Sequence, residues 1–148
     1  MASVTQSDHE QAIGGWKVFQ TTYAQVVSSE PTVRRPIWVA PYRVELGEVA
    51  FINSTVVTGA STNYVKYNLI DGGAEGAGTS ELANRDLASG TDLPLGKTLL
   101  LDATSSGEVF MTQGDILELE TEEQGTGLGS DINEILLYVV YRSSNLSS

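Results

Sequence analysis

The segment 114–128 alternates apolar and acidic residues, and this pattern constrains the fold more than any other feature of the chain. Successive side chains of a β-strand point to opposite faces of the sheet, so a period of two predicts one buried face and one exposed face. Glycines bound the segment at 114, 125 and 127, as tight turns require. We therefore predict an antiparallel strand with a dry face of Leu117, Leu119 and Thr121 and a wet face of Glu118, Glu120 and Glu122.

The rest of the body repeats this pattern as short apolar or alternating runs separated by Gly, Pro, Asn, Asp and Ser. No stretch shows a sustained helical period. Regularly spaced short strands without helices predict an all-β fold, an antiparallel β-sandwich or jelly roll. At 148 residues, one domain is expected. The other expected strands lie at 42–46, 49–52, 63–70, 79–88, 97–103, 109–111 and 135–142.

The N-terminal quarter of the chain has a different character. Residues 1–12 are polar and without periodicity, and 13–27 are rich in aromatic and β-branched residues but alternate poorly, which favours an arm or an edge strand. Pro36 and Pro41 bracket a short apolar run, which places that run at a sheet edge or corner because proline cannot donate to a sheet ladder. We therefore predict an extended N-terminal arm over 1–35 and a sandwich body over 36–148.

Charge is unevenly distributed along the chain. The net charge is −11, yet residues 1–43 are nearly balanced, so the acidity belongs to the body. Such a body is repelled by phosphate backbones and anionic membrane surfaces, so we expect neither nucleic acid nor membrane as a partner. The chain has no cysteine, which excludes disulfides and thiolate chemistry. No signal-like segment or long apolar run is present, which predicts a soluble protein without an export signal.

The residues that could carry chemistry form no convincing active site. The single histidine, His9, lies in the polar tail, and the glutamates of segment 114–128 are more simply explained as a solvated face than as a glycosidase pair. The glycine-dense segment 71–78 matches neither an EF-hand nor a Walker A loop, so an ordinary turn is favoured over a calcium site. We expect no enzymatic activity, no metal and no cofactor.

Several segments together resemble small virion proteins of tailed bacteriophages, namely the capsid decoration or cement proteins. The resemblance spans roughly residues 36–142. It implies a jelly-roll body on the outer surface of the capsid, commonly a homotrimer, with an N-terminal arm that reaches neighbouring subunits. The segments that carry it are Ile-Trp-Val-Ala-Pro-Tyr at 37–42, Arg-Val-Glu at 43–45, Thr-Asn-Tyr at 62–64, Asn-Leu-Ile-Asp-Gly-Gly-Ala-Glu-Gly-Ala-Gly-Thr at 68–79, Gly-Asp-Ile-Leu at 114–117 and Gly-Thr-Gly-Leu at 125–128.

This resemblance makes the expected partners the major capsid protein and other copies of the chain, on a virion assembled in the host cytoplasm. Aromatic side chains and arginines are the residue types that dominate such contacts, although core packing for the tryptophans and a solvated pair for the arginines are the simpler explanations. The candidate partner-binding residues are Trp16, Phe19, Tyr23, Arg34, Arg35, Ile37 and Trp38. The alternative function is a receptor- or glycan-binding head of a phage tail or head fibre, since jelly rolls also serve as lectins.

Overall fold

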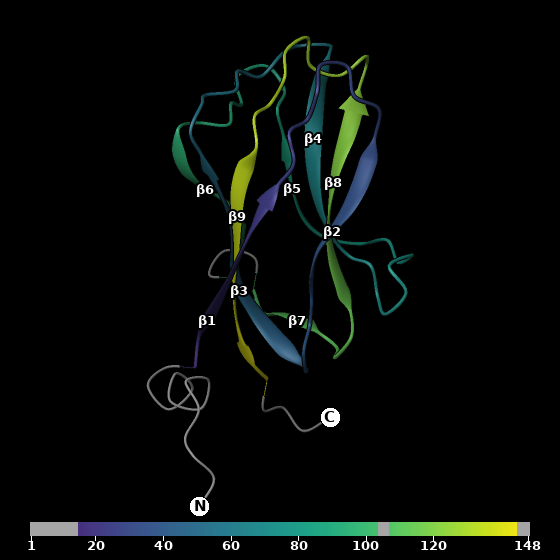
Figure 1. The fold of residues 1–148 in the computed structure, drawn as a ribbon, viewed down its shortest axis with the longest axis vertical. Helices are drawn as coiled ribbons and strands as arrows, with labels where there is room; N and C mark the ends of the chain where they lie inside the picture. The colour runs from purple at the N-terminus through teal and green to yellow at the C-terminus, as the bar shows by residue number, and fades with distance from the viewer. Residues whose placement is uncertain (1–14, 104–106, 145–148) are drawn as a thin grey trace, which may run out of the picture.

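The computed structural model describes residues 15–103 and 107–144, and its elements are strands. Figure 1 shows them as two sheets that lie along the long axis of the molecule. The described residues form β1 (Lys17–Tyr23), β2 (Val33–Val39), β3 (Val44–Asn53), β4 (Tyr64–Asp71), β5 (Ser80–Asp86), β6 (Gly96–Asp102), β7 (Val109–Met111), β8 (Ile116–Gln124) and β9 (Ile135–Ser143).

With the short β7 set aside, the other eight strands pair as one long hairpin folded back on itself. β1 pairs with β9, β2 with β8, β3 with β6 and β4 with β5, all antiparallel. β9 also pairs with β3, and β8 with β4, which rolls the hairpin into sheets of order β1-β9-β3-β6 and β2-β8-β4-β5. Eight antiparallel strands wound into two packed sheets form a jelly roll. The predicted fold class is therefore confirmed.

The two faces of β8 are divided largely as the alternation predicted. Leu117, Leu119 and Thr121 are buried at 0%, 0% and 2% exposure, so the dry face is confirmed. β8 lies inside its sheet between β2 and β4, and its inner face packs on the other sheet. The exception on the wet face is Glu118, which is 6% exposed and therefore not solvated.

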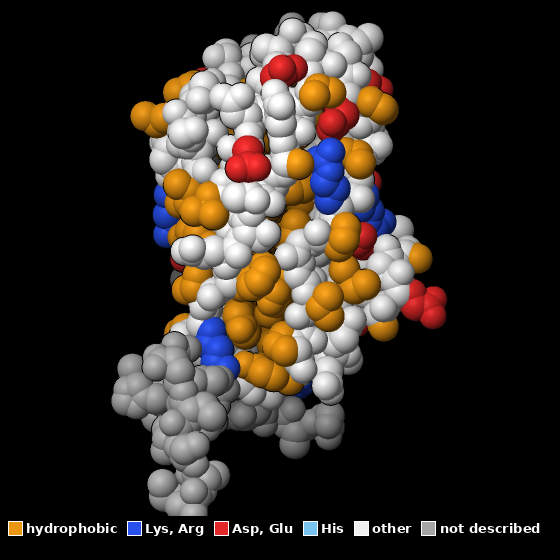
Figure 2. All heavy atoms as spheres, viewed as in Figure 1, with side chains coloured by type: hydrophobic (Ala, Val, Ile, Leu, Met, Phe, Trp, Pro, Cys, Tyr) orange, Lys and Arg blue, Asp and Glu red, His pale blue; other side chains and the backbone are white. Residues whose placement is uncertain are grey.

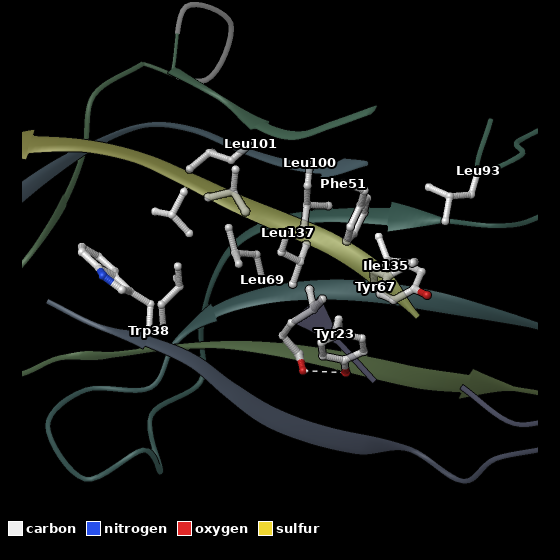
Figure 3. Packing of buried hydrophobic residues seen from close by; sticks show 14 of the residues in the cluster. Tyr23, Trp38, Phe51, Tyr67, Leu69, Leu93, Leu100, Leu101, Ile135 and Leu137 are labelled. Atoms are coloured by element: carbon white, nitrogen blue, oxygen red, sulfur yellow. Dashed lines mark hydrogen bonds between the residues drawn. The ribbon is translucent and has the colours of Figure 1, made fainter. Parts of the chain in front are cut away.

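Aromatic side chains fill the centre of the sandwich. The ring of Tyr67 lies 5.0 Å from that of Phe51 and 6.3 Å from that of Tyr23, the latter in an edge-on arrangement. Figure 3 shows these residues between the two sheets, with Leu69 and Leu137 nearby. The Tyr23 hydroxyl donates to the Leu119 carbonyl at 3.1 Å, so Tyr23 joins the first strand of one sheet to the other sheet.

In the described part of the predicted arm over 1–35, the edge-strand alternative for 13–27 is confirmed, because β1 is the outer strand of its sheet rather than a free arm. β1 pairs with β9 along all seven of its residues, and Val33 and both arginines of the supposed arm pair with β8. The alternation of β1 is hard to recognise in the sequence because its inner face is not wholly apolar. Thr21, which is polar, lies on that face between Phe19 and Tyr23. Residues 1–14, including His9, lie outside the described residues. The boundary at residue 36 falls within β2 and separates no domain.

The expectation of a sheet edge at the proline-bracketed run is confirmed. β2 is the outer strand of its sheet, and its register with β8 shifts between Pro36 and Trp38. A β-bulge next to a proline removes ladder hydrogen bonds, which an edge strand tolerates and a central strand does not. The proline-bracketed run therefore forms the edge of the β2-β8-β4-β5 sheet.

Placing a charge on the dry face of β8 should abolish folding. Leu119→Glu puts an unpaired carboxylate at a fully buried position, which should cost more than about 4 kcal/mol of unfolding free energy. Glu120→Gln, on the opposite face of the same strand, should change it by less than about 1 kcal/mol. Urea titration of both variants measures this, and equal stability would reverse the face assignment.

The two buried tyrosines should respond in opposite directions to loss of their hydroxyl groups. Tyr23→Phe removes a bond to Thr121 at 2.9 Å and one to Leu119, and should cost about 1–2 kcal/mol. The Tyr67 hydroxyl is buried and has no hydrogen-bond partner among the described residues, so Tyr67→Phe should be neutral or stabilising. Chemical denaturation at pH 7 checks the pair, and the reverse order of stabilities would contradict this packing.

Stability should also fall at alkaline pH because of these tyrosines. Burial raises the pKa of Tyr67 and, less strongly, that of Tyr23. The fold favours the neutral phenol, so this stabilisation is complete below the unfolded pKa of about 10 and is lost as the pH rises toward the folded pKa. Unfolding free energy should therefore drop above about pH 10, and Tyr67→Phe should reduce the slope.

Candidate interaction surfaces

The seven predicted partner-binding residues do not form one site. Tyr23 and Trp38 are buried in the core, and Phe19 and Ile37 pack against it. These four cannot serve as freely exposed anchors, because their apolar surface is already used inside the sandwich. Of the seven, Trp16 is the most exposed, at 39%.

Arg34 ties β2 to the glycine-dense loop after β4. Its Nη2 lies 2.8 Å from Glu118 Oε1 and also donates to the carbonyl oxygens of Gly76, at 3.3 Å, and Gly78. The strand register brings this loop close to Glu118, because Ile70 near the end of β4 lies opposite Glu118 on β8. Arg34 therefore holds the loop over the end of this sheet. We call its contacts with Glu118, Gly76 and Gly78 the Arg34 clasp.

The loop in turn buries the carboxylate of Glu118. A Cβ on Gly72 would collide with Glu118 Oε1, so any other residue at position 72 would displace this carboxylate. A Cβ on Gly78 would lie 2.9 Å from the backbone of Gly72. Asp71 begins the loop by accepting a bond from Gly73 N at 2.9 Å, and its desolvation, with Asp115 nearby, raises the pKa of its carboxyl group. Segment 71–78 therefore packs closely over the ion pair between Arg34 and Glu118.

Arg35 points the other way, toward the core. Its guanidinium lies 5.1 Å from the centroid of the Tyr23 ring and 3.6 Å from Glu30 Oε1. A cation over an aromatic face with a carboxylate partner is a stabilising arrangement at a partly buried site. An inward-pointing charge on an edge strand also discourages edge-to-edge pairing. The paired arginines of the sequence therefore have separate intramolecular roles.

An aromatic cluster closes the gap between the two edge strands β1 and β2. The ring of Trp38 lies 4.7 Å from Tyr141 and 6.4 Å from Phe19. Nearby, Lys17 Nζ donates to the Tyr42 hydroxyl at 2.8 Å. Figure 2 shows hydrophobic side chains gathered between these two edges in the lower half of the molecule. The predicted anchors Phe19 and Trp38 therefore pack between the two sheets, where they cover the core at this side of the molecule.

Trp16 lies on the outside of the β1-β9-β3-β6 sheet. The nearest Trp16 ring atom would be 2.9 Å from a Cβ on Gly47, so the absence of a side chain there lets the indole approach the sheet. The guanidinium of Arg142, paired with Glu45 at 2.9 Å, lies 4.4 Å from the centroid of the Trp16 ring. Trp16 is therefore partly covered by its own chain.

The outer faces of the two sheets differ in chemistry. On the β2-β8-β4-β5 sheet the outward side chains are polar and largely acidic: Asn68 Nδ2 donates to Glu120 at 2.8 Å and to Glu122 at 2.9 Å. On the β1-β9-β3-β6 sheet apolar outward side chains lie side by side, and Gln20, Thr22, Glu48 and Lys97 stand beside them on the same face. We define the apolar outer face as Val18, Ala50, Ile52, Leu99, Leu136, Tyr138 and Val140, which the strand register places side by side.

Sequence reasoning missed this apolar face, although a signal for it exists. Residues 135–141 of β9 are apolar or aromatic without a break, whereas a strand with one wet face alternates. Ile135, Leu137 and Val139 are buried inside, so the residues between them must point outward. An uninterrupted apolar run in an antiparallel sheet indicates that both faces are covered.

The described residues contain neither of two simple site types, a metal cluster and a membrane-spanning helix. Among 15–103 and 107–144, no group of three or more acidic or histidine side chains is placed to hold a metal ion. Within the same ranges, no helix is long and apolar enough to span a bilayer.

Comparison with known proteins gives little guidance. No family model matches the chain, and no curated protein matches it. Among solved structures it is similar to "Structure of infectious bursal disease virus Gx strain", at 14% identity and a TM-score of 0.37, over 89% of this chain and 34% of that chain. The Gt strain structure of the same virus gives 12% identity and a TM-score of 0.30, over 89% and 37%. This chain spans about a third of the length of those chains. At this identity and TM-score, the likeness carries no inference about function.

Removing the Arg34 clasp should loosen the loop. Arg34→Met leaves the Glu118 carboxylate, whose side chain is 8% exposed, without its cation, which should cost about 2–4 kcal/mol. Arg142→Met is the matched control, because that arginine is 43% exposed and should cost less than about 1 kcal/mol. Urea titration gives the stabilities, and faster protease cleavage within 72–78 should accompany the Arg34 change alone.

Proposed function

We propose that this chain is a non-enzymatic structural protein of a tailed-bacteriophage virion, a capsid decoration or cement protein. It would bind the outer surface of the major capsid protein shell and stabilise it. The observation that supports this most is that segments 37–45, 62–64, 68–79, 114–117 and 125–128, on which the resemblance rests, lie at strands and turns of one jelly-roll body. The resemblance implies a jelly-roll body, and the structure of this chain has that architecture.

The body is suited to a clamp because contacts within it hold its parts together. A hydrophobic core lies between the sheets, the Arg34 clasp holds the glycine-dense loop, and Tyr23 bonds one sheet to the other. A preorganised partner loses little conformational entropy on binding, so contact energy is available to hold the shell. Many such bodies on one shell would act together, so modest individual affinities suffice.

The chain leaves the sandwich at a single end. Lys17 lies opposite Tyr141 in the sheet, so residues before β1 and after β9 begin near each other. We propose that residues 1–14, together with the exposed part of Trp16, contact the neighbouring capsid subunits. The proposed contact region is thus shorter than the predicted arm over 1–35, because β1 pairs with β9 and Tyr23 is buried in the core.

The proposal includes the remaining expectations from the sequence. The particle would carry the protein as a homotrimer, with no cofactor, no nucleic-acid partner and no membrane contact. The acidic outer face, with Glu120 and Glu122, supports the exclusion of phosphate-rich partners, because like charges repel at short range.

Deletion of residues 1–14 should leave the body folded and weaken binding to purified, undecorated capsids by more than tenfold. Such a loss corresponds to more than about 1.4 kcal/mol. Deletion of 1–33 is the contrasting variant: it removes β1 and Tyr23 from the core and should prevent folding. Co-sedimentation with capsids measures binding, and circular dichroism measures folding. Full-length protein that fails to bind capsids but binds glycans on an array would contradict the proposal in favour of the fibre-head alternative.

A further inference from the structure

The apolar outer face of the β1-β9-β3-β6 sheet is an unusual surface for so acidic a protein. Val18 and Leu99 are 58% and 37% exposed, while Ala50, at 0%, is covered although it points outward. Its register partners Tyr138 and Leu99 flank it on the two neighbouring strands. The face has members on all four main strands of the sheet, and within it Lys97 Nζ lies 5.4 Å from the centroid of the Tyr138 ring.

The size of this face suits a specific but modest contact. Strands lie about 4.8 Å apart and rise about 3.4 Å per residue, so four strands over five residues present roughly 300 Å². Contiguous apolar patches of a few hundred Å² on soluble proteins commonly mark interaction sites. Two such faces in contact would bury about 600 Å² in total, which is below the size of a standard stable interface, so we expect weak association that depends on concentration.

Charges at the border of the face favour another copy of the chain as its occupant. Glu48 pairs with Lys97 at 3.6 Å, and Glu45 pairs with Arg142 at 2.9 Å, so these carboxylates are compensated locally. Asp102 lies opposite Glu48 at the same border. Two chains of net charge −11 repel each other strongly if their acidic surfaces meet. They can approach most easily through a face that is apolar and has its bordering charges paired.

We propose that the apolar outer face is the contact between copies of this chain, with the acidic outer face turned away from it. This replaces the proline-bracketed run as the place of self-contact, because Trp38 is buried within its own chain. Burying Val18, Val140, Leu136 and Tyr138 against a neighbouring copy would remove apolar surface from water without bringing unpaired acids together. The inference concerns self-association and stands independently of binding to a capsid.

A matched pair of valines tests this contact in the full chain. Val18→Lys places a charge on the apolar outer face, whereas Val39→Lys places one on β2, an edge strand of the other sheet, at similar exposure (58% and 53%). Sedimentation velocity from about 1 to 200 μM should show the parent and Val39→Lys associating, and Val18→Lys associating at least tenfold more weakly. Leu99→Lys, on the opposite edge of the face, should match Val18→Lys. Urea titration establishes that each variant is folded.

Three results would overturn the proposal. The first is a parent chain that stays monomeric over the whole range. The second is Val39→Lys weakening association as much as Val18→Lys does. The third is self-association that Val18→Lys leaves unchanged. If Val18→Lys lowers capsid binding but leaves self-association unchanged, the face belongs to the capsid contact, and self-contact through it is wrong. Loss of capsid binding with deletion of 1–14 bears on the proposed function alone, so the two ideas fail separately.

Discussion

The structure depends on pairing between the first and last strands. β1 and β9 are joined along seven residues, and β9 then lies against β3, so neither sheet order nor core is complete until the whole chain has been made. Contacts between such distant segments carry a large loop-closure cost before they contribute stability, which predicts slow, cooperative folding. Tyr23 reinforces this closure, since its hydroxyl reaches Leu119 and Thr121 in the opposite sheet.

Local patterns in the sequence predicted the strands, but contacts set by strand pairing could not be read from them. The alternation of β8 located its buried face, and the prolines located the edge at β2. Burial of Glu118 was not predictable, because it depends on a register that places the loop after β4 and Arg34 on the same carboxylate. The supposed arm failed for a similar reason: the partner of β1 lies more than a hundred residues away.

The candidate surfaces show why aromatic residues and arginines are weak predictors of a partner site. Phe19, Trp38 and Tyr141 fill the open side of the sandwich, and Arg35 lies over the Tyr23 ring. Inside a sandwich of this size, such side chains supply the apolar area that the core needs. The surface that we propose for partners is the apolar outer face. It consists mainly of aliphatic residues on the outside of β9 and the neighbouring strands, and most of these residues are only partly buried.

The central claim is that this rigid jelly roll is displayed on the outside of a phage capsid. Cryo-electron microscopy of the virion whose genome encodes the chain tests it most directly. We expect density for the two-sheet body on the outer surface of the shell, with residues before β1 against capsid subunits and the apolar outer face of each copy against its neighbour. Density confined to the tail or a fibre, or a mature capsid without the body, would contradict it.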